Sequence, residues 1–392
     1  MIDKNFCSLA WQDVTIMLAQ RTLKHCCRAI PEKFPDILTP DFIDNNQQIA
    51  ERRKFMMAGN RHYTCAKCWK EEDETGTSYR IIRGEHSLNK KIKENPKKSF
   101  IKNIGIQFDN ICDQSCIYCF PSTSSIIAKE RGVDNRLKSY IDKDLDAVIL
   151  WIENLYKKSK DKKSIRIYGG EPTASKSWYN FLDKLLTTSL VQEDLQFHII
   201  TNCNMSHETR KKINMYMEKS PPNWIWSWAV SNESTGKISE NVRYYSNWNR
   251  WCENFEFFVT NPYISSLMIA PSPNIFTVKD LPNFIKYILD TVENKNIDRH
   301  ITFNSNWIND PEILDCVYLP ESHKKYVKKT IEIVSNSKAK FNKQNVIHWL
   351  TELEKKIGKK ECNHEKLKKW LDQENLYKNN KLDTELLLKQ II

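Results

Sequence analysis

Three cysteines near the middle of the chain have the residue type and spacing for metal chemistry. Cys112, Cys116 and Cys119 form the pattern C-x3-C-x2-C, with Tyr118 directly before the last cysteine. They follow the alternating apolar stretch 104–108, which reads as a strand. Thiolates are the usual ligands of iron–sulfur clusters, and three of them leave one iron of a 4Fe–4S cluster open to another molecule. The same thiolates with one remote ligand would also suit structural zinc.

A second segment farther along also follows a strand-like run. It reads Gly169, Gly170, Glu171 and Pro172 after the apolar alternation of residues 165–168. In this order the two segments resemble the cluster loop and the Gly-Gly-Glu-Pro segment of radical S-adenosylmethionine (SAM) enzymes. The resemblance implies that the three cysteines hold a 4Fe–4S cluster that chelates SAM through its open iron. It also implies that Tyr118 packs near the adenine and that the second segment contacts the methionine amino group.

Other polar residues end later strands. Asn202 closes the predicted strand 195–201 and Ser231 closes the predicted strand 224–231, and the resemblance implies that both contact SAM. Relatives often carry glycine where this chain has Cys203. We expect Arg243 to be a surface residue, although its planar donor fork would also suit the SAM carboxylate.

A second set of cysteines precedes the first. Cys65 and Cys68 form a C-x2-C pair, and with Cys7 and either Cys26 or Cys27 they supply four thiolates for one closed site. From these residues alone, structural zinc and an iron–sulfur cluster are equally suitable.

The surroundings of this second set carry a further resemblance. The pattern from Arg53 to Arg80 is similar to the twitch module of radical SAM proteins, placed ahead of the core as in some phage-encoded members. The resemblance implies a second, auxiliary 4Fe–4S cluster on Cys7, Cys26, Cys65 and Cys68, with Cys27 as the alternative to Cys26.

Strand and helix patterns alternate from residue 100 to residue 310, which predicts an α/β protein with parallel strands. The resemblance implies a partial (β/α)6 TIM-like barrel, whose chemistry lies at the C-terminal strand ends. We expect Trp224, Trp226 and Trp228 to pack in the core. The predicted strands are 104–108, 164–168, 195–201, 224–231, 265–270 and 301–304, and the predicted helices are 142–156, 177–190, 208–219, 247–259 and 281–292.

The 392 residues suffice for two or three domains. We predict a cysteine-rich, twitch-like auxiliary-cluster domain over 1–98, ending in a lysine-rich linker (85–99), and a radical SAM core over 99–320. A basic helical extension follows over 321–392. Much of the net charge of +11 lies in that extension, which has 17 Lys and Arg against 10 Asp and Glu. We interpret this excess as a solvated helical surface, with nucleic acid as the alternative partner.

No apolar run is long enough to cross a membrane, and the N-terminus has no signal-peptide pattern. We therefore expect a cytoplasmic protein without membrane contact, located in the host cytoplasm if a phage encodes it. Twelve cysteines in a reducing compartment favour metal binding over disulfides.

The predicted function is reductive cleavage of SAM to a 5′-deoxyadenosyl radical that abstracts hydrogen from a substrate. We expect a peptide or protein substrate, with a nucleotide or nucleic acid as the alternative, and a one-electron reductant such as flavodoxin or ferredoxin as partner. The rival hypothesis is a non-catalytic zinc protein that binds nucleic acid.

Overall fold

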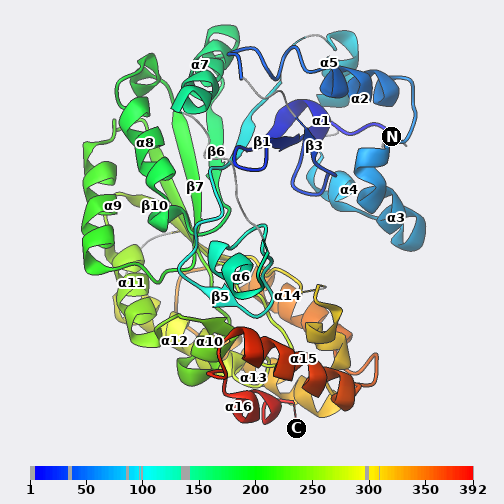
Figure 1. Ribbon diagram of the computed structural model, residues 1–392, viewed down its shortest axis with the longest axis vertical. Coiled ribbons are helices and arrows are strands. Elements are labelled where there is room, and N and C mark those ends of the chain that lie inside the picture. The colour runs from blue at the N-terminus through cyan, green and yellow to red at the C-terminus, as the bar shows by residue number, and fades with distance from the viewer. Residues whose placement is uncertain are drawn as a thin grey trace.

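A nine-stranded sheet organises the molecule (Figure 1). The structure is a computed structural model that describes residues 5–33, 38–84, 88–96, 98, 100–133, 142–295, 300–308 and 310–391. The strand order is β11-β10-β8-β7-β6-β4-β1-β2-β3. Among the described residues the edge strands β11 and β3 do not pair, so the sheet is open and closure into a barrel stays a prediction.

Neighbouring strands run parallel along the sheet from β11 to β1. Strand β2 is antiparallel to β1, and β3 is antiparallel to β2. All six strands predicted from the sequence are present, with ends shifted by no more than one residue. The parallel strands are β1 (Asp13–Met17), β4 (Asn103–Gln107), β6 (Lys163–Ile167), β7 (Leu195–Thr201), β8 (Ile225–Val230), β10 (Ile264–Ile269) and β11 (His300–Phe303); the edge hairpin is β2 (Thr22–Lys24) and β3 (Glu32–Lys33).

The N-terminal segment contributes a strand that the sequence analysis did not predict. After the short helix α1 (Leu9–Gln12), β1 pairs in parallel with β4, with Val14 opposite Ile104 and Ile16 opposite Ile106. All five residues of β1 are buried. Residues 13–17 of the predicted N-terminal domain are therefore part of the same sheet as the predicted core domain.

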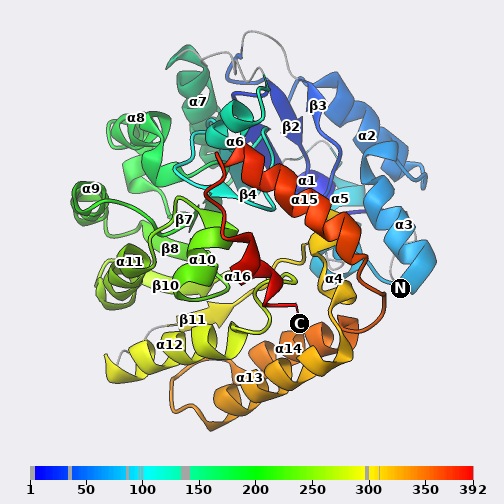
Figure 2. The same cartoon turned by 60° about the horizontal axis from the view of Figure 1, so that its bottom comes forward.

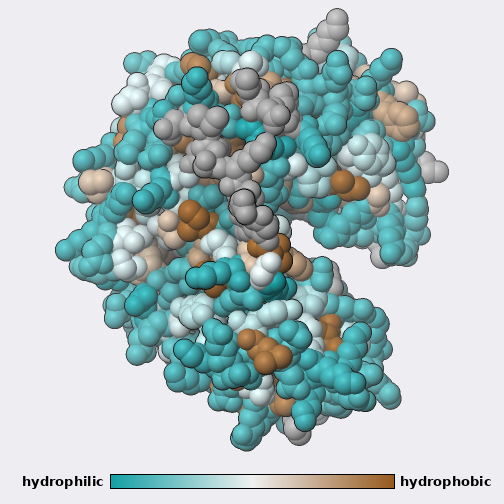
Figure 3. All heavy atoms as spheres, viewed as in Figure 1, coloured by the Kyte–Doolittle hydropathy of each residue, from teal (hydrophilic) through white to brown (hydrophobic). Residues whose placement is uncertain are grey.

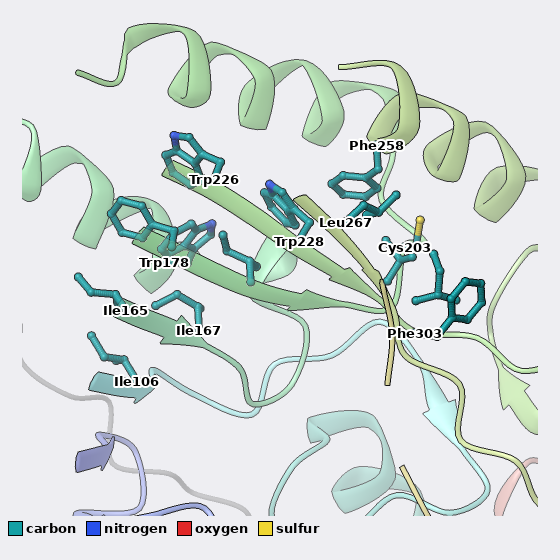
Figure 4. Packing of buried hydrophobic residues seen from close by; sticks show 14 of the residues in the cluster. Ile106, Ile165, Ile167, Trp178, Cys203, Trp226, Trp228, Phe258, Leu267 and Phe303 are labelled. Carbon is teal, nitrogen blue, oxygen red and sulfur yellow. The ribbon is translucent and has the colours of Figure 1, made fainter. Parts of the chain in front are cut away.

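Amphipathic helices cover the outer face of the sheet (Figure 1). Trp226 and Trp228 point from β8 into this layer, where they pack against Trp178 and Phe258 (Figure 4). The tryptophan stripe is thus core packing, as predicted. The helices between strands are α7 (Asp142–Lys158), α8 (Lys176–Leu185), α9 (His207–Lys219), α11 (Trp248–Thr260) and α12 (Leu281–Asn294).

A smaller apolar core lies beside the sheet edge at the N-terminal end of the chain. It is built from Phe6, Trp11 and Trp69 together with buried cysteines and Ile92. Ile92 belongs to α5 (Leu88–Glu94), so the stretch 85–99 contains a packed helix where a linker was predicted; residues 85–87, 97 and 99 lie outside the described part. The other helices of this region are α2 (Gln47–Met57), α3 (Ala66–Thr75) and α4 (Tyr79–Arg83).

The C-terminal extension is helical, as predicted. Its helix α13 (Lys324–Asn336) packs between α12 and α14 (Lys343–Lys356). Helices α15 (His364–Tyr377) and α16 (Thr384–Leu388) then return toward the middle of the molecule, where α15 lies beside α6 (Ser125–Glu130) (Figure 2). None of the described helices combines the length and apolar character needed to cross a membrane.

Candidate functional site

The residues singled out by sequence lie where consecutive parallel strands end. The cysteine loop, residues 108–124, follows β4; the glycine segment, residues 169–172, follows β6; Asn202 follows β7 and Ser231 follows β8. Because these strands are parallel neighbours, their carboxyl ends share one edge of the sheet. The fold therefore places the predicted core-site residues along one edge.

Backbone pairing fixes the shape of the cysteine loop. Its short strand β5 (Ser115–Cys116) pairs with β9 (Arg243–Tyr244), which lies far away in sequence. The N–H of Ile117 donates to the carbonyl of Val242 at 3.0 Å. The N–H of Cys119 donates to the carbonyl of Cys116 at 3.0 Å, which closes a tight turn between these two cysteines.

The three sulfurs of this loop are half-buried and close enough to influence one another. Burial raises the pKa of the Cys112 thiol, and the neighbouring Cys116 sulfur raises it further. Burial likewise raises the pKa of Cys116 to about 12, with Arg243 opposing the shift and Cys119 adding to it. Metal binding at this loop must therefore displace protons from neutral thiols.

The arrangement of these thiols bears on the kind of metal group that suits them. Among the described residues, no three His, Cys, Asp or Glu side chains converge tightly enough to hold one metal ion. The cysteines of an iron–sulfur cluster each bind a different iron, and three soft thiolate donors on one loop fit the ligand set of such a cluster.

The glycine segment lies directly on the backbone of the cysteine loop. A β-carbon on Gly170 would overlap the carbonyl group of Ile111. It would lie 2.6 Å from the carbonyl carbon of Ile111 and 2.7 Å from that of Asn110. Gly169 has φ +135°, and a β-carbon there would lie 2.9 Å from the carbonyl oxygen of Asp109. The space beside these two glycines is thus filled by the chain itself, and contact with SAM stays a prediction.

Glu171 ties the ends of β6 and β7 together. Its side chain is 2% exposed; one oxygen accepts hydrogen bonds from the N–H of Thr173 at 3.0 Å and the hydroxyl of Thr201 at 2.9 Å, and the other accepts from the N–H of Asn202 at 2.6 Å. Burial raises the pKa of Glu171 to about 7, and the Asp113 carboxylate acts in the same direction. Both carboxylate oxygens already accept hydrogen bonds from the chain itself, and the predicted contact of Glu171 with the SAM ammonium stays a prediction.

Asp113, between the first two cysteines of the loop, makes a second connection to β7. One carboxylate oxygen accepts from the side-chain amide of Asn202 at 2.6 Å, and the other accepts from Asn204 at 3.0 Å. Sequence reasoning did not identify Asp113, because its partners are far away along the chain. The predicted ligand contact Asn202 is therefore also a brace between the cysteine loop and β7.

A buried ion pair lies beneath Tyr118. The Arg243 guanidinium donates to both oxygens of Glu233, with the shortest distance 2.7 Å, and the Tyr118 hydroxyl donates to the same carboxylate at 3.0 Å. Glu233 is fully buried and Arg243 is 5% exposed. The prediction of a surface arginine was wrong, since β9 turns Arg243 inward beside β5.

Ser231 is held by its backbone N–H, which donates to the carbonyl of Thr201 at 2.9 Å.

Cys203 is part of the hydrophobic core and not of the site. Its φ of +62° is a left-handed conformation that glycine adopts with less strain. The side chain is fully buried, with its sulfur 3.8 Å from the carbonyl of Trp251, and Figure 4 shows it among core residues near Phe303. The thiol therefore anchors the β7 end to α11.

The molecular surface is hollowed between the N-terminal region and the C-terminal helices (Figure 3). The cysteine loop carries two exposed apolar side chains, Ile111 at 42% and Phe120 at 39%, which flank the cysteines in sequence.

The second cysteine set surrounds a cavity in the N-terminal core. Cys7, Cys26, Cys65 and Cys68, each no more than 6% exposed, line one small pocket, whereas Cys27 is exposed and is not among the lining residues. Burial raises the pKa values of Cys7, Cys26 and Cys65 to about 12, each with a contribution from another of these sulfurs. Four inward-facing thiols around one space fit a closed metal or cluster site.

His25 belongs to the same cavity and was missed as a site residue. It is 2% exposed, and its Nε2 lies 3.1 Å from the sulfur of Cys65. Burial lowers the pKa of His25, and Arg52 lowers it further, so the ring is neutral at physiological pH. Its position next to Cys26 in sequence was the only available signal.

Comparison with known proteins leaves the family open. No family model and no curated protein matches this chain. Among solved structures, anSMEcpe with bound AdoMet is similar at 16% identity and a TM-score of 0.40, covering 61% of this chain and 64% of that one. SuiB of Streptococcus suis is similar at 14% identity and a TM-score of 0.39, both bound to S-adenosylmethionine (74% of this chain, 64% of that one) and bound to precursor peptide SuiA (73% and 64%). The chain spans less than two thirds of these proteins.

Proposed function

We propose that this protein is a radical SAM enzyme. The observation that carries the proposal is the close backbone packing of the glycine segment on the cysteine loop. Gly170 lies against Ile111, and the N–H of Glu171 donates to the Ile111 carbonyl at 2.6 Å. This packing brings a C-x3-C-x2-C loop and a Gly-Gly-Glu-Pro segment to one sheet edge, where parallel α/β folds bind ligands.

In this proposal the residues of the chain bind the cluster, orient SAM beside it and shield both from water. Cys112, Cys116 and Cys119 would hold a 4Fe–4S cluster, with the glycine segment beside it to receive SAM. When bound, the cluster supplies the electron that cleaves SAM into methionine and a 5′-deoxyadenosyl radical, which takes hydrogen from the substrate. Through its side chain Asp113 holds the cysteine loop against the β7 end, and through its backbone N–H Glu171 holds the loop against the β6 end, which would position the bound groups.

The N-terminal cavity is proposed as the site of an auxiliary 4Fe–4S cluster of the twitch type. Its four buried thiols would saturate the cluster, in contrast to the three of the cysteine loop. A saturated cluster has no open iron, so its role would be electron transfer or support of a bound substrate. Cys26 is the proposed fourth ligand because it lines the cavity and Cys27 does not.

A peptide or protein is the proposed substrate, with a flavodoxin- or ferredoxin-like reductant in the cytoplasm. The basic extension lends little support to a nucleic-acid substrate, because many of its lysines already pair with carboxylates. These pairs are Lys324–Glu321, Lys328–Glu354, Lys355–Glu352, Lys369–Glu365 and Lys389–Glu385.

Anaerobic purification followed by a SAM-cleavage assay tests the proposal. We expect a brown protein with about eight irons, four for each cluster, that forms 5′-deoxyadenosine from SAM under dithionite. Deuterated candidate peptides should transfer deuterium into the deoxyadenosine if they are substrates. A colourless chain that contains only zinc and leaves SAM intact would contradict the enzyme hypothesis.

Removing two ligands of the auxiliary site tests that site separately. The double variant Cys65→Ala/Cys68→Ala should contain about four irons and keep the spectral change that SAM causes in the core cluster. Cys26→Ala should also lose auxiliary iron, whereas the matched variant Cys27→Ala should keep wild-type iron, because Cys27 faces solvent. If Cys27→Ala loses iron while Cys26→Ala keeps it, Cys27 is the fourth ligand in place of Cys26.

A further inference from the structure

The C-terminal extension places a buried lysine beneath the cysteine loop. Lys378, directly after α15, is 1% exposed, and its ammonium donates to the hydroxyl of Ser115 at 2.8 Å. It lies 3.4 Å from the carboxylate of Glu130 on α6 and 3.8 Å from that of Glu374 on α15. These contacts join segments more than two hundred residues apart in sequence.

The charges around Lys378 balance within the protein. Arg131 donates to Glu374 at 2.7 Å, so two cations face two carboxylates. The hydroxyl of Ser115 in turn donates to Glu130 and links the lysine to the same carboxylate. Because a buried charge is costly unless it is paired and hydrogen-bonded, removal of Lys378 would leave this group with excess negative charge.

The position of Lys378 relative to the proposed cluster ligands is specific. Ser115 directly precedes Cys116 on β5, and the ammonium also lies 5.4 Å from the ring centre of Tyr244 on the partner strand β9. Figure 2 shows α15 crossing the molecule beside α6. The helix therefore supports both strands of the small ladder that positions the middle cysteine.

We propose that Lys378 is a positioning residue of the core cluster, through which the C-terminal extension fixes β5 and places a positive charge beside the Cys116 ligand. The inference rests on the proposed function for its electronic part only. The positioning part concerns the cysteine loop itself and holds whatever group the loop binds.

Hydrogen exchange of the full chain tests the positioning part. In Lys378→Met, the amides of residues 113–119 and 240–246 should exchange roughly tenfold faster or more, because a hydrogen bond from a charged group is lost. Lys378→Arg should restore slow exchange, and Lys369→Met, an exposed lysine of the same helix, should match the wild type. Ser115→Ala removes the other side of the contact while both charged partners remain, and it should also speed exchange in these segments.

The reduction potential of the core cluster tests the electronic part. Lys378→Met should shift this potential to more negative values, because the reduced cluster loses a nearby positive charge, while the auxiliary cluster keeps its own potential. Lys378→Arg should retain the wild-type potential.

The possible results separate the inference from the proposed function. Wild-type exchange in the 113–119 segment of both Lys378→Met and Ser115→Ala would overturn the inference, as would an unchanged potential in Lys378→Met. A uniform rise in exchange across all strands of both variants would also overturn it, because that result indicates general destabilisation. Absence of iron from every variant would instead contradict the proposed function, and the exchange data would still test the support of the loop.

Discussion

Replacing Cys112, Cys116 and Cys119 together by alanine is expected to remove about four of about eight irons and to abolish formation of 5′-deoxyadenosine. The three thiolates lie on one short loop, and the alanine side chains leave the cluster without protein ligands there. SAM would then have no iron to bind, and no electron would reach it for the cleavage. The measurement is iron content together with deoxyadenosine formed under dithionite, relative to the wild type.

The matched control removes three other cysteines. Cys252, Cys316 and Cys362 lie outside both cysteine sets, so the triple alanine variant should keep its iron and its SAM cleavage. Cys316 is buried, and its replacement should cost about 1 kcal/mol of stability, because only one sulfur atom is removed. Deoxyadenosine formed by the Cys112/Cys116/Cys119 variant would show that the ligand assignment is incorrect.

The sequence predicted the strands of the sheet well because each carries its own signal. Leu195–Thr201 alternates buried and less buried residues, and Ile225–Val230 is an apolar run buried after its first residue. Both lie between helices, so local pattern suffices. The strands β5 and β9 have two residues each and exist only because Ser115 meets Tyr244 across the fold. No local pattern could reveal them. Strand β1 carries a similar but shorter signal, because Val14 and Ile16 alternate with Asp13 and Thr15 over only five residues.

The candidate site also has one part that local sequence predicts and another part that it does not. Cysteine spacing and the Gly-Gly-Glu-Pro segment are local, and the fold brings them to one edge as expected. The supporting contacts of Asp113, Arg243 and Lys378 depend on long-range topology, and no spacing rule indicates which distant residue will face them. The sequence thus identifies the groups suited to the chemistry, while the structure identifies what holds them in place.

Gly170 offers the sharpest test of the contact between the two motifs. In Gly170→Ala the new methyl group would overlap the Ile111 carbonyl and press on Asn110, and both obstacles are backbone that cannot rotate away. Overpacking of this kind costs about 1–3 kcal/mol, and relief requires the glycine segment to move off the cysteine loop. The hydrogen bond from Glu171 to Ile111 would then lengthen or break.

We therefore expect Gly170→Ala to weaken SAM binding by at least roughly tenfold, equivalent to about 1.4 kcal/mol, while the three cysteines still bind iron. SAM affinity is measured by titrating the spectral change of the core cluster, and stability by denaturant unfolding. Gly59→Ala is the control, because Gly59 has φ +79° with no atom within 4 Å of a new β-carbon, so it adds backbone strain without a clash. It should leave SAM affinity unchanged. If Gly170→Ala binds SAM as tightly as the wild type, the packing of the glycine segment on the cysteine loop does not form the SAM site, and the central observation behind the proposed function fails.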